Sequence, residues 1–282
     1  MAHRFYLNSE ISDGHAQLSG DQAHHALHVM RLRVGDELVL FDGRGWEHVA
    51  RISAIQKQSL ELEIKASQHV TAENRCSVFV AVALPKGDRQ KFLIEKLVEL
   101  NVTGLIPLKT SRSVSLVNDQ VAKRLERNII EASKQCERNV LMSLAPQHTL
   151  AQLIKLATAG PKEWPGLSPA KTVDGGQSSS ATTDSACLFL VADPSADCHL
   201  MELIKNPAPE ISAVIVAIGP EGGFSDDELI QFESQGWSKV GLGPTILRIE
   251  TAAIVAAVLM NAGFRIAQVP AEDLAPDSNA QN

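Results

Sequence analysis

Two glycine-rich stretches decide the fold of the last third of this chain: Ile218-Gly219-Pro220-Glu221-Gly222-Gly223-Phe224 and Leu242-Gly243-Pro244-Thr245-Ile246-Leu247-Arg248-Ile249-Glu250-Thr251-Ala252. Each follows an apolar run, residues 213–218 or 239–242, that predicts a buried parallel strand, and each leads into a predicted helix. Glycine allows positive φ and a close approach of the backbone to a ligand. The pattern therefore predicts that the two turns cradle one small molecule at neighbouring strand ends. Neither stretch matches a phosphate-binding motif, so the ligand need not be a nucleotide phosphate.

The composition indicates two domains with sizeable cores, because the chain has 282 residues and 44% of them are hydrophobic. No apolar stretch reaches the roughly 18 residues that a membrane span requires. The four cysteines, at positions 76, 136, 187 and 198, form no CxxC pair. This spacing favours reduced thiols over a zinc site or a disulfide framework, so we expect a cytoplasmic protein with no membrane partner.

The charge is distributed unevenly along the chain. The net charge is −7, yet residues 73–140 hold 12 Lys/Arg against 8 Asp/Glu, whereas residues 186–282 hold 4 against 13. A nucleic-acid backbone responds to the local patch rather than to the net charge, so the basic central segment is compatible with an RNA partner. The alternative is that these charges form a solvated helix face.

Residues 1–72 predict a small β-rich domain. Turn signals separate strand-like runs at residues 37–41, 47–52 and 60–64, a spacing that suggests a small barrel. Four aromatic side chains of this domain are predicted to lie in its core: Phe5, Tyr6, Phe41 and Trp46.

Seven of the nine histidines precede residue 70. His24 and His28 have the i, i+4 spacing of a metal pair, but no third ligand follows at a useful distance, so we predict no metal site. We instead expect a helical turn of the front domain, with Arg31 and Arg33 available for phosphate contacts.

Residues 73–268 predict an α/β domain in which strands alternate with helices. The predicted strands span residues 77–84, 105–108, 187–192, 213–218 and 239–242, and the predicted helices begin near residues 88, 118, 225 and 251. Ser225 and Glu228 form a capping box directly after the first glycine turn. Residues 160–186 are rich in Gly, Pro, Ser and Thr and are predicted to be a disordered insertion, and residues 269–282 a disordered tail.

Three segments carry a resemblance to a known family: residues 84–101, beginning Leu84-Pro85-Lys86-Gly87-Asp88-Arg89, and the two glycine turns. In order and spacing they resemble the SPOUT superfamily of S-adenosylmethionine-dependent RNA methyltransferases, and more narrowly the family that methylates N3 of a uridine in 16S ribosomal RNA. The run from His24 to Asp36 extends the resemblance to the front domain. The resemblance implies a PUA-like RNA-binding domain, a parallel-sheet domain with a trefoil knot, and a homodimer acting on 16S rRNA in the small ribosomal subunit.

The resemblance also implies roles for individual residues. The S-adenosylmethionine pocket is expected to be lined by Leu84, Gly219, Pro220, Glu221, Gly222, Gly223, Leu242, Gly243, Ile246, Leu247, Arg248, Thr251 and Ala252. Its backbone groups and apolar walls suit an adenine ring. The expected RNA contacts are Arg31, Arg33, Lys86, Arg89, Arg112, Arg124 and Arg138.

The implied chemistry is displacement at a methyl carbon by uridine N3, which must lose a proton. Glu221 and Glu250 are the candidate bases, because a buried carboxylate can accept a proton near neutral pH. Arg112, Arg138 and Arg248 are candidates for phosphate contact or for stabilising negative charge on the base oxygens. For each arginine, a structural or RNA-backbone role is the alternative.

The chain departs from the family pattern near the expected RNA side. The family usually has Arg at position 245, Thr at 249 and Glu at 111, where this chain has Thr245, Ile249 and Ser111. It usually reads Glu-Gln-Ser-Gly-Arg where this chain reads Lys134-Gln135-Cys136-Glu137-Arg138. Two alternatives therefore stay open: a SPOUT methyltransferase for another RNA position, or a catalytically silent RNA-binding factor in ribosome assembly.

Overall fold

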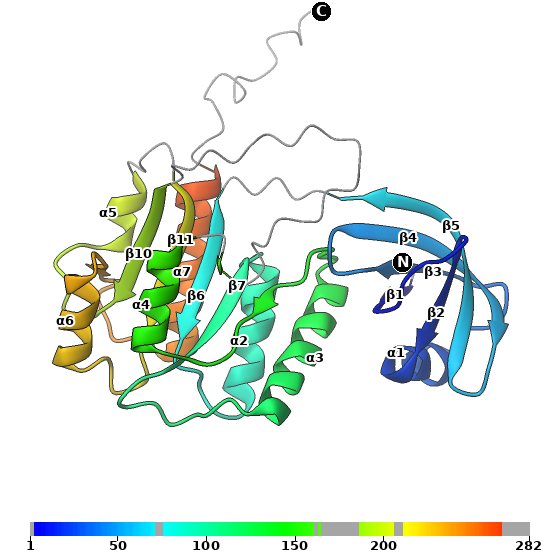
Figure 1. The fold of residues 1–282 in the computed structure, drawn as a ribbon, viewed down its shortest axis with the longest axis horizontal. Coiled ribbons are helices and arrows are strands. Elements are labelled where there is room, and N and C mark those ends of the chain that lie inside the picture. The colour runs from blue at the N-terminus through cyan, green and yellow to red at the C-terminus, as the bar shows by residue number, and fades with distance from the viewer. Residues whose placement is uncertain (1–2, 71–75, 161–162, 165–185, 206–210, 267–282) are drawn as a thin grey trace, which may run out of the picture. The chain divides into compact units, whose positions relative to one another are not determined.

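The computed structural model describes residues 3–70, 76–160, 163–164, 186–205 and 211–266. Its contacts form two compact units, residues 1–73 with 124–142 and residues 74–123 with 143–282 (Figure 1). Helix α3 (Asp119–Gln135) begins in the second unit, and its larger part belongs to the first. The domain limits near residue 72 stay a prediction.

The first unit is built on a curled five-stranded sheet with the strand order β1-β3-β4-β5-β2 (Figure 1). β1 pairs in parallel with β3, and the other neighbours pair antiparallel. A short helix, α1 (Gly20–His24), continues into a π-helical turn, η1 (His25–Val29). The strands are β1 (His3–Tyr6), β2 (His15–Ser19), β3 (Glu37–Phe41), β4 (Trp46–Ile55) and β5 (Ser59–His69). The curled sheet agrees with the predicted barrel-like front domain.

Apolar side chains from these strands form one core, which includes Phe5, Leu40 and Ile52. Trp46, by contrast, is 38% exposed, so its predicted place in the core is wrong. The reason is its position as the first residue of β4, beyond the edge of the core. There its ring lies beside that of His48, in a parallel arrangement, and beside the edge-on ring of His69.

The second unit is a parallel α/β layer with the sheet order β12-β10-β11-β6-β7-β8, and β9 pairs with the far end of β7. Every strand pair in it is parallel, as predicted. The strands are β6 (Ser77–Val82), β7 (Gly104–Lys109), β8 (Ser143–Leu144), β9 (His148–Thr149), β10 (Ala186–Ala192), β11 (Ile211–Ile218) and β12 (Ser238–Val240). The helices are α2 (Asp88–Glu99), α4 (Leu150–Ala159), α5 (Leu200–Lys205), α6 (Asp226–Ser234) and α7 (Ile249–Asn261), followed by the π-helical turn η3 (Ala262–Ile266).

Helices cover both faces of this sheet (Figure 1). On one face, Phe79 and Ala81 of β6 pack in a core with Leu153 of α4 and Phe232 of α6. On the other face, α7 packs against β6, β11 and α2. Because α7 is buried along most of its length, the predicted apolar helix is confirmed. Within the described part of the chain, every helix is too short or too polar to cross a bilayer.

Trp164 lies near the start of the predicted disordered insertion, but the structure places it in the core. Its side chain is 1% exposed and packs edge-on against Phe79, and its Nε1 donates to the carbonyl of Leu156. The large apolar area of one tryptophan thus orders a position inside a polar, glycine-rich stretch. Residues 165–185 and the predicted tail lie outside the described residues.

Candidate functional site

The two glycine turns lie together at one edge of the parallel sheet. β10 lies between β11 and β12, so the carboxyl ends of these three strands are neighbours. The first turn follows β11, the second follows β12, and the chain after β10 completes the group. These three connections and the first turns of α6 and α7 enclose a cavity of about 360 Å³. The two turns converge on one cavity as predicted, but the prediction that they follow neighbouring strands is wrong, because β10 lies between β11 and β12.

Most of the residues predicted to bind a cofactor line this cavity. They are Gly219, Pro220, Glu221, Gly222, Gly223, Leu242, Gly243, Ile246, Leu247 and Ala252. Three predicted residues do not line it. Leu84 is buried beside the end of β6, Arg248 is the exposed N-cap of α7, and Thr251 is exposed on the first turn of α7.

The sequence prediction missed one wall of the cavity, residues 192–195, which follow β10. Asp193 is 9% exposed, and its Oδ1 accepts hydrogen bonds from the backbone N and the hydroxyl of Ser195, both at 2.9 Å. Its Oδ2 is buried and has no hydrogen-bond partner among the described residues. A signal was present, because an Asp-Pro pair directly follows a predicted buried strand of the same parallel sheet. The other lining residues that the sequence prediction missed are Ile218, Phe224, Leu229, Thr245 and Ile249.

Arg89 joins the two predicted catalytic glutamates. Its Nη2 lies 3.2 Å from Oε1 of Glu221, and its Nη1 lies 3.8 Å from Oε2 of Glu250. Glu221 is accessible at the cavity wall, whereas the Glu250 side chain is 8% exposed at the start of α7. One arginine on α2 therefore links both glycine turns. Its role as an RNA contact stays a prediction.

The loop after β7 braces the first glycine turn. Arg112 donates from Nη1 to the carbonyl of Gly222 at 2.6 Å. The buried carboxylate of Glu228 accepts from the backbone N of Ser111 at 2.8 Å and from that of Ser225 at 2.9 Å. The predicted capping box is thus confirmed and extended to a neighbouring loop. Lys86, the remaining predicted RNA contact of this unit, is exposed in the connection between β6 and α2.

The first unit contains Arg31, Arg33, Arg124 and Arg138, all predicted to bind RNA. The first three are exposed, and Arg138 donates from Nε to the carbonyl of Val140 at 2.6 Å. Arg138 belongs to the first unit and the cavity to the second, so the predicted grouping of Arg138 with the glutamates stays a prediction. Among the described residues, no group of three or more His, Cys, Asp or Glu side chains is placed to hold a metal.

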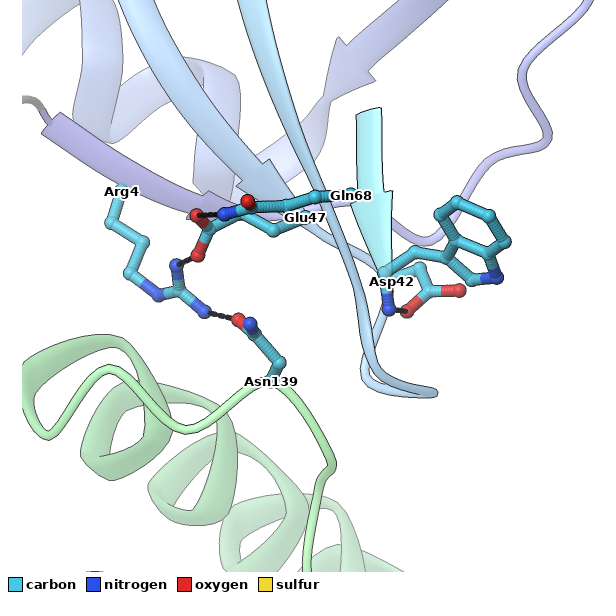
Figure 2. A network of polar contacts seen from close by, with 6 residues as sticks. Arg4, Asp42, Glu47, Gln68 and Asn139 are labelled. Carbon is cyan, nitrogen blue, oxygen red and sulfur yellow. Dashed lines mark hydrogen bonds and ion pairs between the residues drawn. The ribbon is translucent and has the colours of Figure 1, made fainter. Parts of the chain in front are cut away.

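A polar network fastens the segment after α3 to the sheet of the first unit (Figure 2). Arg4 donates to Glu47 and to the side-chain oxygen of Asn139, and Gln68 donates to Glu47 at 2.9 Å. Burial alone raises the pKa of the Glu47 carboxyl, but the hydrogen bonds from Arg4 and Gln68 and the Arg4 charge hold it below its usual value. The network therefore fixes the backbone next to Arg138.

Comparison with known proteins identifies the family. The model of the RNA methyltransferase domain matches residues 72–261, and that of the RNA methyltransferase PUA domain matches residues 18–65. The chain is 30% identical over 260 residues to a ribosomal RNA small subunit methyltransferase E from Rickettsia conorii, an alignment that covers 90% of this chain and 92% of the relative. The chain belongs to the ribosomal RNA small subunit methyltransferase E family. A member from Bacillus subtilis is 26% identical over 245 residues, or 85% of this chain and 86% of that protein.

Solved structures of this methyltransferase E family share the fold. The protein from Neisseria gonorrhoeae, solved bound to S-adenosyl methionine, has a TM-score of 0.73 and 26% identity, and the match covers 93% of this chain and 98% of that one. The resemblance drawn from the sequence motifs is thereby confirmed, together with the parallel-sheet α/β domain and the PUA-like front domain.

One departure from the methyltransferase E pattern has a direct structural consequence. Glu137, where the family usually has glycine, adopts φ = +59°, a left-handed conformation that costs about 1 kcal/mol for a residue with a Cβ. We expect Glu137→Gly to raise the free energy of unfolding by about that amount, measured by urea denaturation. The control is Glu126→Gly in the interior of α3, which should lower it by about 1 kcal/mol. A loss of stability in both variants would contradict this account.

His48 gives the first unit a pH dependence. The ring is 6% exposed and its Nδ1 lies 2.7 Å from the Ser67 hydroxyl; burial lowers the pKa of His48 below 6.5. Burial therefore favours the neutral ring in the folded state, and the stability that depends on it is present above the ordinary histidine pKa and is lost as pH falls through the lowered pKa. We expect His48→Gln to reduce the fall in melting temperature between pH 7.5 and 5.5. An equal fall in both proteins would exclude His48 as a contributor.

Proposed function

We propose that this protein transfers a methyl group from S-adenosylmethionine to N3 of a uridine in 16S rRNA of the small ribosomal subunit. The observation that carries the proposal is the cavity formed by both glycine turns in a chain of the methyltransferase E family. The ribosomal RNA substrate is inferred from the names of the relatives. The cofactor is inferred from the Neisseria gonorrhoeae structure, which was solved bound to S-adenosyl methionine.

The cavity fits this cofactor on four counts. Its volume lies in the usual range for small-molecule sites, and Leu242, Leu247 and Phe224 provide apolar walls for an adenine. The charged side chains among the described lining residues are Asp193 and Glu221, both acidic, which suits a sulfonium cation. The Asp193 carboxylate also offers an unused hydrogen-bond acceptor.

When bound, S-adenosylmethionine supplies an electrophilic methyl group. The protein must then hold the uridine in line with that methyl group and accept the proton of uridine N3. Glu221 is the better-placed acceptor, because it lines the cavity and is accessible, whereas Glu250 is 8% exposed and does not line the cavity. Arg248 is exposed at the N-cap of α7, where its charge is available to the base oxygens or to phosphate.

We further propose a knotted cofactor domain, a homodimer and a cytoplasmic location. Exposed apolar side chains at Met201, Ile246 and Val258 support contact with a second copy. The spacing of the four cysteines does not suggest a disulfide framework, which fits a reducing compartment. The PUA match and the basic segment around α3 support contact with RNA.

Methyl transfer to isolated ribosomal subunits tests the substrate. Labelled S-adenosylmethionine is mixed with the enzyme and small or large subunits from cells that lack this modification. We expect label in the RNA of the small subunit only. Label confined to large-subunit RNA would support another RNA target, and cofactor binding without transfer to any RNA would support a silent assembly factor.

Arg138 should matter for transfer rather than for cofactor binding. Because its unit does not contribute to the described cavity, we expect Arg138→Ala to lower kcat/KM for transfer by about 100-fold, the order of one lost charge contact. The dissociation constant of S-adenosylmethionine, measured by calorimetry, should change by less than about twofold. Arg138→Lys keeps the positive charge but removes the guanidinium Nε that donates to the carbonyl of Val140, so it separates the effect of the charge from that of this hydrogen bond. A matching loss of cofactor affinity would contradict the proposed role.

A further inference from the structure

Asp193 lines the cavity and carries a buried carboxylate oxygen that has no hydrogen-bond partner among the described residues. The residue is 9% exposed, and Ser195 occupies Oδ1 with two hydrogen bonds, while Oδ2 has none among the described residues. A buried carboxylate oxygen without a donor is costly, and a ligand that provides one removes that cost. The carboxylate is therefore prepared for a donor that the protein does not supply.

The backbone holds this carboxylate at a defined place. The amide of Asp193 donates to the carbonyl of Val240 at the end of β12, and its own carbonyl accepts from the amide of Ala196. These bonds fasten Asp193 between the strand end that precedes the second glycine turn and its own loop. These bonds fix the backbone of Asp193, and the two hydrogen bonds from Ser195 fix the orientation of its carboxylate.

We propose that the Asp193 carboxylate accepts hydrogen bonds from the ribose hydroxyls of the cofactor. An acidic residue at the end of a parallel strand, beside a glycine turn, is the general arrangement for holding a ribose in nucleotide-binding sheets. A neutral diol also loses less hydration energy than an ammonium group when it enters a buried position. The inference rests on the proposed function, because it assigns one contact within the same cofactor site.

Calorimetric binding of a ligand series tests the assignment. The series is S-adenosylmethionine, S-adenosylhomocysteine, methylthioadenosine and 2′-deoxy-methylthioadenosine, of which the third lacks the amino-acid part and the fourth also lacks one hydroxyl. We expect Asp193→Ala to weaken the first three alike, by about 30-fold, and Asp193→Asn by about tenfold. The wild-type preference for methylthioadenosine over its 2′-deoxy form should disappear in Asp193→Ala. Asp197→Asn, an exposed acid of the same loop outside the cavity lining, is the matched control and should bind all four normally.

Each other outcome overturns the ribose assignment. A loss confined to the two ligands with an amino group would place the carboxylate at the ammonium, and a loss for S-adenosylmethionine alone would place it at the sulfonium. Unchanged affinities would make Asp193 purely structural. If the wild-type protein bound no member of the series, the proposed function itself would fail, which distinguishes the two failures.

Discussion

Gly243→Leu is expected to weaken S-adenosylmethionine binding by about 100-fold, or about 2.8 kcal/mol, while the fold is retained. Gly243 lines the cavity, and a Cβ built there meets no heavy atom within 4 Å outside its chain neighbours. The new side chain therefore enters open space at the cavity wall without a clash in the protein. Titration calorimetry gives the affinity, and thermal unfolding gives the state of the fold.

Two controls accompany this variant. Gly243→Ala adds one methyl group and should show a smaller loss, because it fills less of the cavity. Gln231→Leu adds the same leucine to the exposed face of α6 and should leave binding unchanged. Normal affinity in Gly243→Leu would show that the cofactor does not occupy this cavity.

Arg89→Ala is expected to have the second large effect, a loss of about 2 kcal/mol in the free energy of unfolding. The value lies between that of exposed and of buried ion pairs, because Arg89 is 41% exposed while Glu250 is 8% exposed. The substitution leaves a buried carboxylate without its cation and releases the link between the two glycine turns. Urea denaturation measures the loss, and cofactor affinity should fall with it.

A double-mutant cycle separates the charge effect from general damage. Glu250→Gln removes the buried charge, so Arg89→Ala combined with Glu250→Gln should recover a large part of the lost stability. Lys91→Ala is the matched control, because it breaks an exposed ion pair with Glu95 on the same helix and should cost less than about 0.5 kcal/mol. Strictly additive losses would show that Arg89 and Glu250 are not coupled.

The sequence predicted those parts of the molecule whose signals are local. Apolar runs located β6, β10 and β11, and the Ser225–Glu228 pair located the start of α6. The family resemblance carried by the glycine turns implied ten of the cavity residues.

Features that depend on the order of the strands escaped prediction. Nothing local shows that β10 lies between β11 and β12, so the wall at Asp193 was missed. The partners of Arg4 are 43 and 135 residues away, a separation that no periodicity reveals. The ion pairs of Arg89 were likewise hidden, because an exposed-looking charge at the start of a helix reads equally well as an RNA contact.

The most direct test of the central claim is nucleoside mass spectrometry of small-subunit RNA after incubation with the enzyme and S-adenosylmethionine. Subunits from cells that lack the modification serve as substrate, and enzyme that carries Gly243→Leu serves as the negative control. The account predicts one equivalent of 3-methyluridine at a single position of 16S rRNA. A methyl group on any other nucleobase atom or on a ribose would contradict it.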